Sequence, residues 1–342
     1  MAWSRNEFLK MIGYGSVSTL LPSGITQLSK FNSDEMVRPP RLRRGDVIGM
    51  ISPASTLPPD TSFDKIIQTI QAMGFRVQEG SSARQVYGGL GGTDQVRAED
   101  LNAMFYNPEI NAIMPFRGGW GSNRILHMID YDMIRRNPKP LIGFSDITSL
   151  LLSIYAKTGM VTFHGPFGKS IWNDFTTRHF KQMLMRNGQT TLENPPDAGI
   201  TVQTISSGTA RGKLLGGNLT VLTSMLGSDF LPEWEGSILF LEDIGEEPYR
   251  IDRMLTQLKL NGILDKLNGF IFGRCTNCES SGGQSLTMEQ IFADHIKPLG
   301  VPAFYGSMIG HIDRMFTLPI GVNAEIHAET GSIKILESPT TT

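Results

Sequence analysis

The sequence predicts an α/β protein with an N-terminal parallel-sheet α/β domain and a C-terminal, β-rich α/β domain. Between residues 46 and 164, short apolar runs alternate with segments of helical spacing. This alternation is typical of right-handed βαβ units and a parallel sheet. From residue 210 onward apolar strands continue, but the chain closes with a hairpin pattern, which adds antiparallel pairing.

The composition is that of an ordinary globular protein. The chain has 342 residues, of which 40% are hydrophobic and 19% charged, and its formal net charge is −2. This length suits about two domains. The absence of a basic block argues against a nucleic-acid partner. No apolar run reaches the roughly 18 residues of a membrane span, and two cysteines are too few for a disulfide-dense scaffold.

Residues 1–37 are expected to form an N-terminal extension outside the domains. The segment Ser4-Arg5-Asn6-Glu7-Phe8-Leu9-Lys10 precedes a mildly apolar run that ends near Leu21. It resembles a twin-arginine export signal in which Asn6 replaces the second arginine. Export to the periplasm is expected on this ground. Because the arginine pair is incomplete and no A-x-A cleavage site follows, a cytoplasmic protein with an extended N-terminus is the alternative.

The N-terminal domain, residues 38–168, is expected to alternate strands with helices. Its first helix is stopped by Gly74, and its second is capped by Thr93 or Asp94. Polar residues that follow the strands should gather at the carboxyl edge of the parallel sheet, where such folds bind ligands. These residues are Ser52, Ser122, Ser145 and His164. The expected strands are 46–51, 75–77, 112–116, 141–144 and 161–164, and the expected helices are 63–73, 94–106 and 146–157.

Residues 169–207 are polar and proline-bearing, which predicts an irregular connection between the domains. The C-terminal domain, residues 208–342, begins with a glycine-rich run that leads through Asn218 into a helix. A strongly apolar strand then stops at Glu242, and Pro248 opens the next helix. The remaining expected strands are 270–272 and 301–304, and the expected hairpin pairs 324–327 with 333–336.

The segment 116–124 has the pattern of a strand, a glycine-rich turn and a helix start, with the hydroxyl of Ser122 at the turn. Glycines permit the φ values of a sharp turn, and a following helix N-terminus offers N–H groups to an anion or an oxyanion. Three interpretations stay open here: a nucleophilic serine, an ordinary N-cap serine, and a phosphate-cradling loop. The G-x-S-x-G spacing is absent, since Trp120 and Arg124 stand where glycines would be.

Among the six histidines, His311 follows a glycine in a loop-like setting, and His164 lies at a strand end in a similar, weaker one. Glu242 ends an apolar strand, where an unpaired carboxylate is costly to bury. It could therefore orient an imidazole, as the third member of a catalytic triad does. The alternative is a solvated acidic loop made of Glu242, Asp243, Glu246 and Glu247.

Cys275 and Cys278 form a C-x-x-C pattern. With no second pair and no nearby histidine it does not indicate zinc, and its place after a strand argues against a thioredoxin-like motif. Two separate thiols, or a local disulfide in an exported protein, fit better. The sequence lacks a Walker A loop, an H-E-x-x-H motif and an EF-hand. We therefore expect no cofactor and no metal.

Several segments, taken in order, resemble the LD-carboxypeptidase family of serine peptidases, which includes the microcin-immunity hydrolases. The run Arg-Gly-Gly-Trp-Gly-Ser-Asn-Arg at 117–124 is one of them. Each segment alone is a weak signal, but they follow one another in family order, and the resemblance covers about residues 41–336. The others are 45–55, 92–105, 142–148, 162–166, 216–219, 241–243, 248–253, 310–311 and 318–321.

The resemblance implies a two-domain α/β fold, a homodimer and a Ser-Glu-His triad. By motif it assigns the nucleophile to Ser122, the acid to Glu242 and the base to His311. The N–H of Asn123, with one from the preceding glycines such as Gly119, would then bind the oxyanion.

The resemblance also implies a murein tetrapeptide substrate, cut before its terminal D-alanine. Arg117 or Arg124 would bind the free carboxylate of that substrate. One alternative is a microcin-immunity-type hydrolase of peptidyl nucleotides. The other is a non-catalytic α/β protein that uses the glycine loop as an anion-binding nest.

Overall fold

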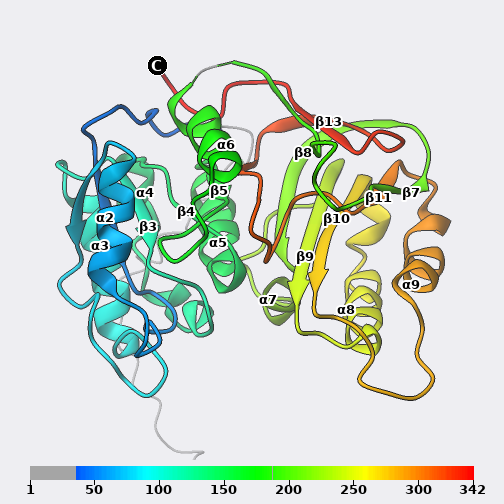
Figure 1. Cartoon of the computed structure of the whole chain (residues 1–342), viewed down its shortest axis with the longest axis horizontal. Coiled ribbons are helices and arrows are strands. Elements are labelled where there is room, and N and C mark those ends of the chain that lie inside the picture. The colour runs from blue at the N-terminus through cyan, green and yellow to red at the C-terminus, as the bar shows by residue number, and fades with distance from the viewer. Residues whose placement is uncertain (1–35, 187) are drawn as a thin grey trace, which may run out of the picture. The chain divides into compact units, whose positions relative to one another are not determined.

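The computed structural model describes residues 36–186 and 188–342 (Figure 1). The twin-arginine-like segment lies outside these residues. Within them, no helix has both the length and the apolar character needed to cross a membrane.

The N-terminal half is built on parallel strands, as the alternation predicted. β1 (Val47–Ile51) pairs in parallel with β2 (Arg76–Glu79) and with β3 (Ala112–Pro115). A parallel bridge from Ile113 to Leu141 leads from β3 toward β4 (Ile142–Gly143), which pairs in parallel with β5 (Thr162–His164). The exception comes from the C-terminal half, because β12 (Leu318–Ile320) adds to β5 in antiparallel orientation.

α2 (Phe63–Ala72) ends just before its expected stop, Gly74, and α3 (Asp94–Tyr106) begins at one of its two expected caps, Thr93. The side chains of Ser62 and Thr93 accept hydrogen bonds from the first turns of α2 and α3. After the glycine-rich turn the chain forms the 3-10 helix η1 (Ser122–Met128), whose N-cap is Gly121. Ser122 is therefore the first helical residue and not the N-cap residue. The remaining helices are α4 (Tyr131–Arg136), η2 (Ser145–Ile147) and α5 (Thr148–Thr158).

The C-terminal half contains an eight-stranded mixed sheet of order β6-β14-β13-β8-β9-β10-β11-β7. Its central strands β8 (Thr209–Asn218), β9 (Ser237–Ile244), β10 (Leu267–Thr276) and β11 (Ala303–Tyr305) run parallel. The expected hairpin is present as β13 (Asn323–His327) and β14 (Ser332–Ile335). The helices are α7 (Leu219–Ser224), α8 (Pro248–Leu260), η3 (Leu264–Lys266), α9 (Met288–His295) and η4 (Lys297–Leu299).

The segment expected to be an irregular connection is regular over much of its length. It contains α6 (Asp174–Met185), β6 (Thr190–Leu192) and β7 (Gln203–Ser206). β6 and β7 are the two edge strands of the eight-stranded sheet. Edge strands pair on one side only and tolerate polar and proline residues, so their composition resembled that of a loop.

The two halves meet where α5 contacts β8 and α7 (Figure 1). The backbone N–H of Asn218, the last residue of β8, donates to Thr148 Oγ1 at 2.9 Å. Thr148 is the first residue of α5 and follows β4 closely in the chain. This contact holds the carboxyl end of β4 near the carboxyl ends of β8 and β9.

Candidate active site

Ser145 lies at a sharp turn between β4 and η2. Its φ is 61°, and only one other non-glycine residue in the described part of the chain, Asn277, has a positive φ. Such a value is uncommon for a residue with a side chain and marks a tight, functionally constrained turn. A strand, a strained serine and a helix in succession form the nucleophile elbow of serine hydrolases. The turn also needs Gly143, because a Cβ there would stand 2.9 Å from Ile147.

The imidazole of His311 connects Ser145 to Glu242. Its Nε2 lies 3.0 Å from Ser145 Oγ, and its Nδ1 lies 2.8 Å from Glu242 Oε2. Because a carboxylate can only accept, Nδ1 carries the proton and Nε2 faces the hydroxyl as an acceptor. The Glu242 side chain is fully buried, that of His311 is 18% exposed, and Ser145 is half-buried, so exposure to solvent increases from the carboxylate toward the hydroxyl. Hydroxyl, imidazole and carboxylate stand in the order of a catalytic triad.

The His311–Glu242 pair shifts the pKa of both groups. Burial lowers the pKa of the His311 imidazole, but the charge and hydrogen bond of Glu242 outweigh it and raise that pKa above its ordinary value. Burial likewise raises the pKa of the Glu242 carboxyl, while the charge and hydrogen bond of His311 bring it below the usual range. Glu242 is therefore ionised and stabilises a protonated His311.

Ser122 is not the hydroxyl that His311 contacts, so the expected pairing of these two residues is wrong. Ser122 is fully buried. Its Oγ donates to the backbone oxygen of Asp146 at 2.6 Å and lies 2.6 Å from Ser149 Oγ, while its N–H donates to Asp146 Oδ2 at 2.8 Å. These bonds fasten the start of η1 beneath the turn that carries Ser145. Ser122 braces that turn from inside the protein.

A local signal for Ser145 was present in the sequence. The short apolar run 141–144 ends in Gly-Phe, and Ser145 then opens a helix. The three glycines around Trp120 gave the stronger signal of a sharp turn, although the turn that presents a serine to His311 is the one that carries Ser145. The oxyanion assignment to Asn123 loses its ground with Ser122, because Asp146 is the residue that follows Ser145.

The glycine-rich loop nevertheless borders the site. A Cβ on Gly118 would stand 3.0 Å from Ser145 Cβ and 3.3 Å from the backbone nitrogen of Asp146. Only a glycine lets the loop approach the elbow this closely. The neighbouring Gly119 has a φ of 110° and packs against Ser55. The loop and the N-terminus of η2 thus bring backbone groups together beside the Ser145 hydroxyl.

The two candidate arginines differ in their partners. Arg124 donates to Asp94 through Nε at 3.0 Å and through Nη2 at 2.9 Å. Arg117 makes one long hydrogen bond, from Nη1 to the Thr56 carbonyl at 3.4 Å. Within the described residues no carboxylate forms an ion pair with Arg117. Of the two, only Arg117 has its charge available for a ligand.

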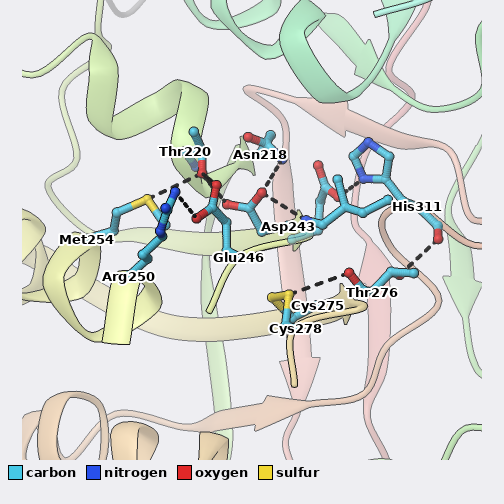
Figure 2. Close-up of a disulfide and its surroundings, with 12 residues drawn as sticks. Asn218, Thr220, Asp243, Glu246, Arg250, Met254, Cys275, Thr276, Cys278 and His311 are labelled. Atoms are coloured by element: carbon cyan, nitrogen blue, oxygen red, sulfur yellow. Dashed lines mark hydrogen bonds and ion pairs between the residues drawn. A yellow bond between two sulfur atoms is a disulfide. The ribbon is translucent and has the colours of Figure 1, made fainter. Parts of the chain in front are cut away.

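Asp243, next to Glu242, is held in a separate network (Figure 2). Its carboxylate accepts hydrogen bonds from Asn218 Nδ2 at 3.0 Å and from Thr220 Oγ1 at 2.8 Å. Burial and the charge of Glu242 raise the pKa of Asp243 to about 6. This network joins the end of β9 to the start of α7 and so fixes the backbone that carries Glu242.

Cys275 and Cys278 form a disulfide, the local pairing that was one of the alternatives for these residues. Between them, Thr276 Oγ1 donates to the backbone oxygen of His311 at 2.9 Å (Figure 2). The turn that the disulfide closes therefore contacts the histidine loop directly. In the described residues, no group of three or more His, Cys, Asp or Glu side chains could hold a metal ion.

The other histidines do not meet a serine and a carboxylate in this way. His164 is fully buried against Phe240, and burial lowers its pKa to about 4. The remaining ones pack on or bond to neighbouring elements: His127 on Phe230, His179 on Phe175, His295 on Asp252 and His327 on Glu325.

Comparison with known proteins agrees with this architecture. The family model described as the LD-carboxypeptidase N-terminal domain matches residues 48–165, and that of the LD-carboxypeptidase C-terminal domain matches residues 211–326. The chain is 38% identical over 297 residues to the probable murein peptide carboxypeptidase of Bacillus subtilis, covering 85% of this chain and 91% of that protein.

Two further similarities bear on the function. The chain is 32% identical over 284 residues to the murein tetrapeptide carboxypeptidase of Pseudomonas aeruginosa, covering 81% of this chain and 92% of that one. The solved structure of the microcin C7 self immunity protein MccF superposes with a TM-score of 0.82 at 31% identity, covering 89% of this chain and 100% of that one. Both the expected family resemblance and the expected α/β fold are confirmed.

Proposed function

Because the chain belongs to the LD-carboxypeptidase family of serine peptidases, we propose that it hydrolyses the amide bond before the terminal D-alanine of murein tetrapeptides. The observation that carries the proposal is the row Ser145–His311–Glu242, with its 3.0 Å and 2.8 Å contacts. The substrate class is taken from the relatives named as murein peptide and murein tetrapeptide carboxypeptidases.

In the acylation step, Ser145 Oγ attacks the carbonyl carbon of the scissile amide. His311 Nε2 accepts the hydroxyl proton as the new C–O bond forms. Glu242 keeps the imidazole in the required tautomer and stabilises the imidazolium. The N–H groups of Asp146 and Gly119 are the proposed oxyanion donors, since Asp146 follows the nucleophile and the glycine loop lies against it.

Collapse of the tetrahedral intermediate breaks the C–N bond. The proton on His311 passes to the departing amino group, so D-alanine leaves neutral at nitrogen. A water molecule then loses a proton to His311 and attacks the acyl-enzyme carbonyl, and the shortened peptide is released as Ser145 regains its proton. These steps need no group beyond the three side chains and the backbone donors.

Mass spectrometry of D-alanine released from murein tetrapeptide tests this function. Ser145→Ala should lower the rate of D-alanine release by about 10³-fold or more while the protein stays folded. Ser122→Ala is the matched control, because it removes a neighbouring hydroxyl that does not contact His311. Unchanged release by Ser145→Ala would exclude Ser145 as the nucleophile.

A second candidate is a hydrolase of peptidyl nucleotides, favoured by the similarity to the microcin immunity structure. The same triad could serve it, because only the leaving group differs. Release of a nucleotide product, with no D-alanine from any murein peptide, would support this candidate.

The proposed homodimer rests on the family resemblance, and light scattering of the purified chain tests it.

A further inference from the structure

A cavity of about 900 Å³ lies beside the glycine-rich loop. Its walls come from the segments that follow β1, β2 and β3, and they include Ser55, Phe63, Arg84, Arg117, Gly119 and Trp120. Gly118, between two of these residues, packs against Ser145. The loop 117–120 therefore contacts the proposed nucleophile and also lines the cavity. Ser145 itself does not line the cavity, so a ligand bound there would extend past this loop to reach the reactive serine.

The cavity has an excess of positive charge. Two of its lining residues are arginines, and none of the described residues that line it is acidic. Arg84 is neutralised by Glu79 at 2.7 Å and by Asp64 at 2.6 Å. Arg117 has no such partner in the described chain, and its one hydrogen bond, to Thr56, is 3.4 Å long. A guanidinium with donors to spare is suited to bind a carboxylate in a forked geometry.

Trp120 supplies an apolar wall next to this charge. Its side chain is 52% exposed, although its backbone N–H is fixed by a bond of 3.1 Å to Ser55 Oγ. Gly89 lies against the indole ring, where a Cβ would stand 3.3 Å from Nε1. An exposed tryptophan on a fixed backbone is a typical anchor for a ligand. Cation and indole together fit a ligand that is partly apolar and carries a negative charge.

We propose that this cavity binds the acyl part of the substrate and that Arg117 holds a carboxylate of that part, with Trp120 packed against the chain that carries it. The proposal rests on the proposed function, in which Ser145 attacks a peptide. The size of the cavity, about 900 Å³, argues for the acyl part, because pockets of about 300–1,000 Å³ hold ligands much larger than one alanine. The ligand class is therefore an acidic peptide.

Calorimetry with the Ser145→Ala protein tests the subsite without turnover. The ligands are an acidic tetrapeptide, the same peptide with its acyl-part carboxylates amidated, and free D-alanine. Adding Arg117→Gln should weaken binding of the acidic peptide by about 10- to 100-fold and change binding of the amidated peptide less than about twofold. Arg124→Gln, whose arginine is paired with Asp94, is the matched control and should affect neither.

Three results would overturn the proposal. In the first, Arg117→Gln weakens binding of both peptides equally. In the second, it weakens binding of D-alanine alone. In the third, the acidic peptide shows no detectable binding to folded Ser145→Ala protein. Thermal melting identifies variants that fail to fold, and Arg117→Lys provides a second variant with the charge retained. The proposed function is judged separately, by D-alanine release from the protein with Ser145 intact.

Discussion

His311 Nε2 lies 3.0 Å from Ser145 Oγ, although 166 positions separate the two residues in the chain. The serine comes from the parallel sheet of the first half and the histidine from a loop beyond β11 in the second. Neither half alone holds both groups. The contact depends on docking of the halves, to which the Asn218–Thr148 bond contributes.

The two serines should separate in a stability measurement. Ser122→Ala removes a buried hydroxyl that bonds to Asp146 and faces Ser149. It should lower the free energy of unfolding by about 2 kcal/mol. Ser145→Gly should raise it by about 1 kcal/mol, because glycine adopts the positive φ of this turn with less strain. Urea unfolding measures both, and a stability loss confined to Ser145→Gly would contradict this assignment of roles.

The activity should fall on the acid side at a pH above the ordinary histidine pKa of 6.5. His311 must be neutral to accept the serine proton. Because Glu242 raises the pKa of His311 above 6.5, the imidazole becomes protonated as the pH falls through that raised pKa, before it reaches 6.5. Glu242→Gln removes the raising charge and leaves burial, which lowers the pKa. The acid limb of kcat/KM should therefore move to lower pH, with kcat reduced by about 10³-fold. An unmoved limb would show that another group governs it.

Gly310 should be intolerant of a side chain. Its φ is 119°, and a Cβ would stand 2.9 Å from Glu242 Oε2, the atom that bonds His311. Gly310→Ala should lower kcat by at least about 10-fold, because the carboxylate or the histidine loop must move. Gly227→Ala is the matched control, since its φ is also positive, at 84°, with nothing within 4 Å. Equal losses of kcat in the two variants would refute the steric explanation.

The Cys275–Cys278 turn should influence His311 through Thr276. Thr276→Val removes the 2.9 Å hydrogen bond to the His311 carbonyl and should cost about 1 kcal/mol of stability. It should also lower kcat a few-fold, while Thr276→Ser keeps the bond and the rate. Reduction of the disulfide should lower the kcat of the wild-type protein by a similar factor. Reduction of the Thr276→Val protein should cause no further loss of kcat. Steady-state kinetics before and after reduction check this, and additive losses would indicate separate causes.

Local patterns predicted most elements, because strand alternation, caps and turns depend on neighbouring residues. The end of α2 before Gly74, the Thr93 cap of α3, the proline start of α8 and the β13–β14 hairpin follow directly from such signals. The edge strands β6 and β7 were missed. Their pairing partners lie far away in the chain, and their own composition is that of a loop.

The sequence by itself indicated the family, the parallel and mixed sheets and, through the family resemblance, two members of the candidate triad, Glu242 and His311. Only the tertiary structure decided between the serines. Both follow strands and begin helices, and the glycines around Trp120 favoured Ser122. Burial and direction differ: Ser122 Oγ is enclosed against Asp146, while Ser145 is held at φ 61° toward the imidazole. The burial of Ser122 and the orientation of Ser145 arise from packing between distant segments, which no local pattern encodes.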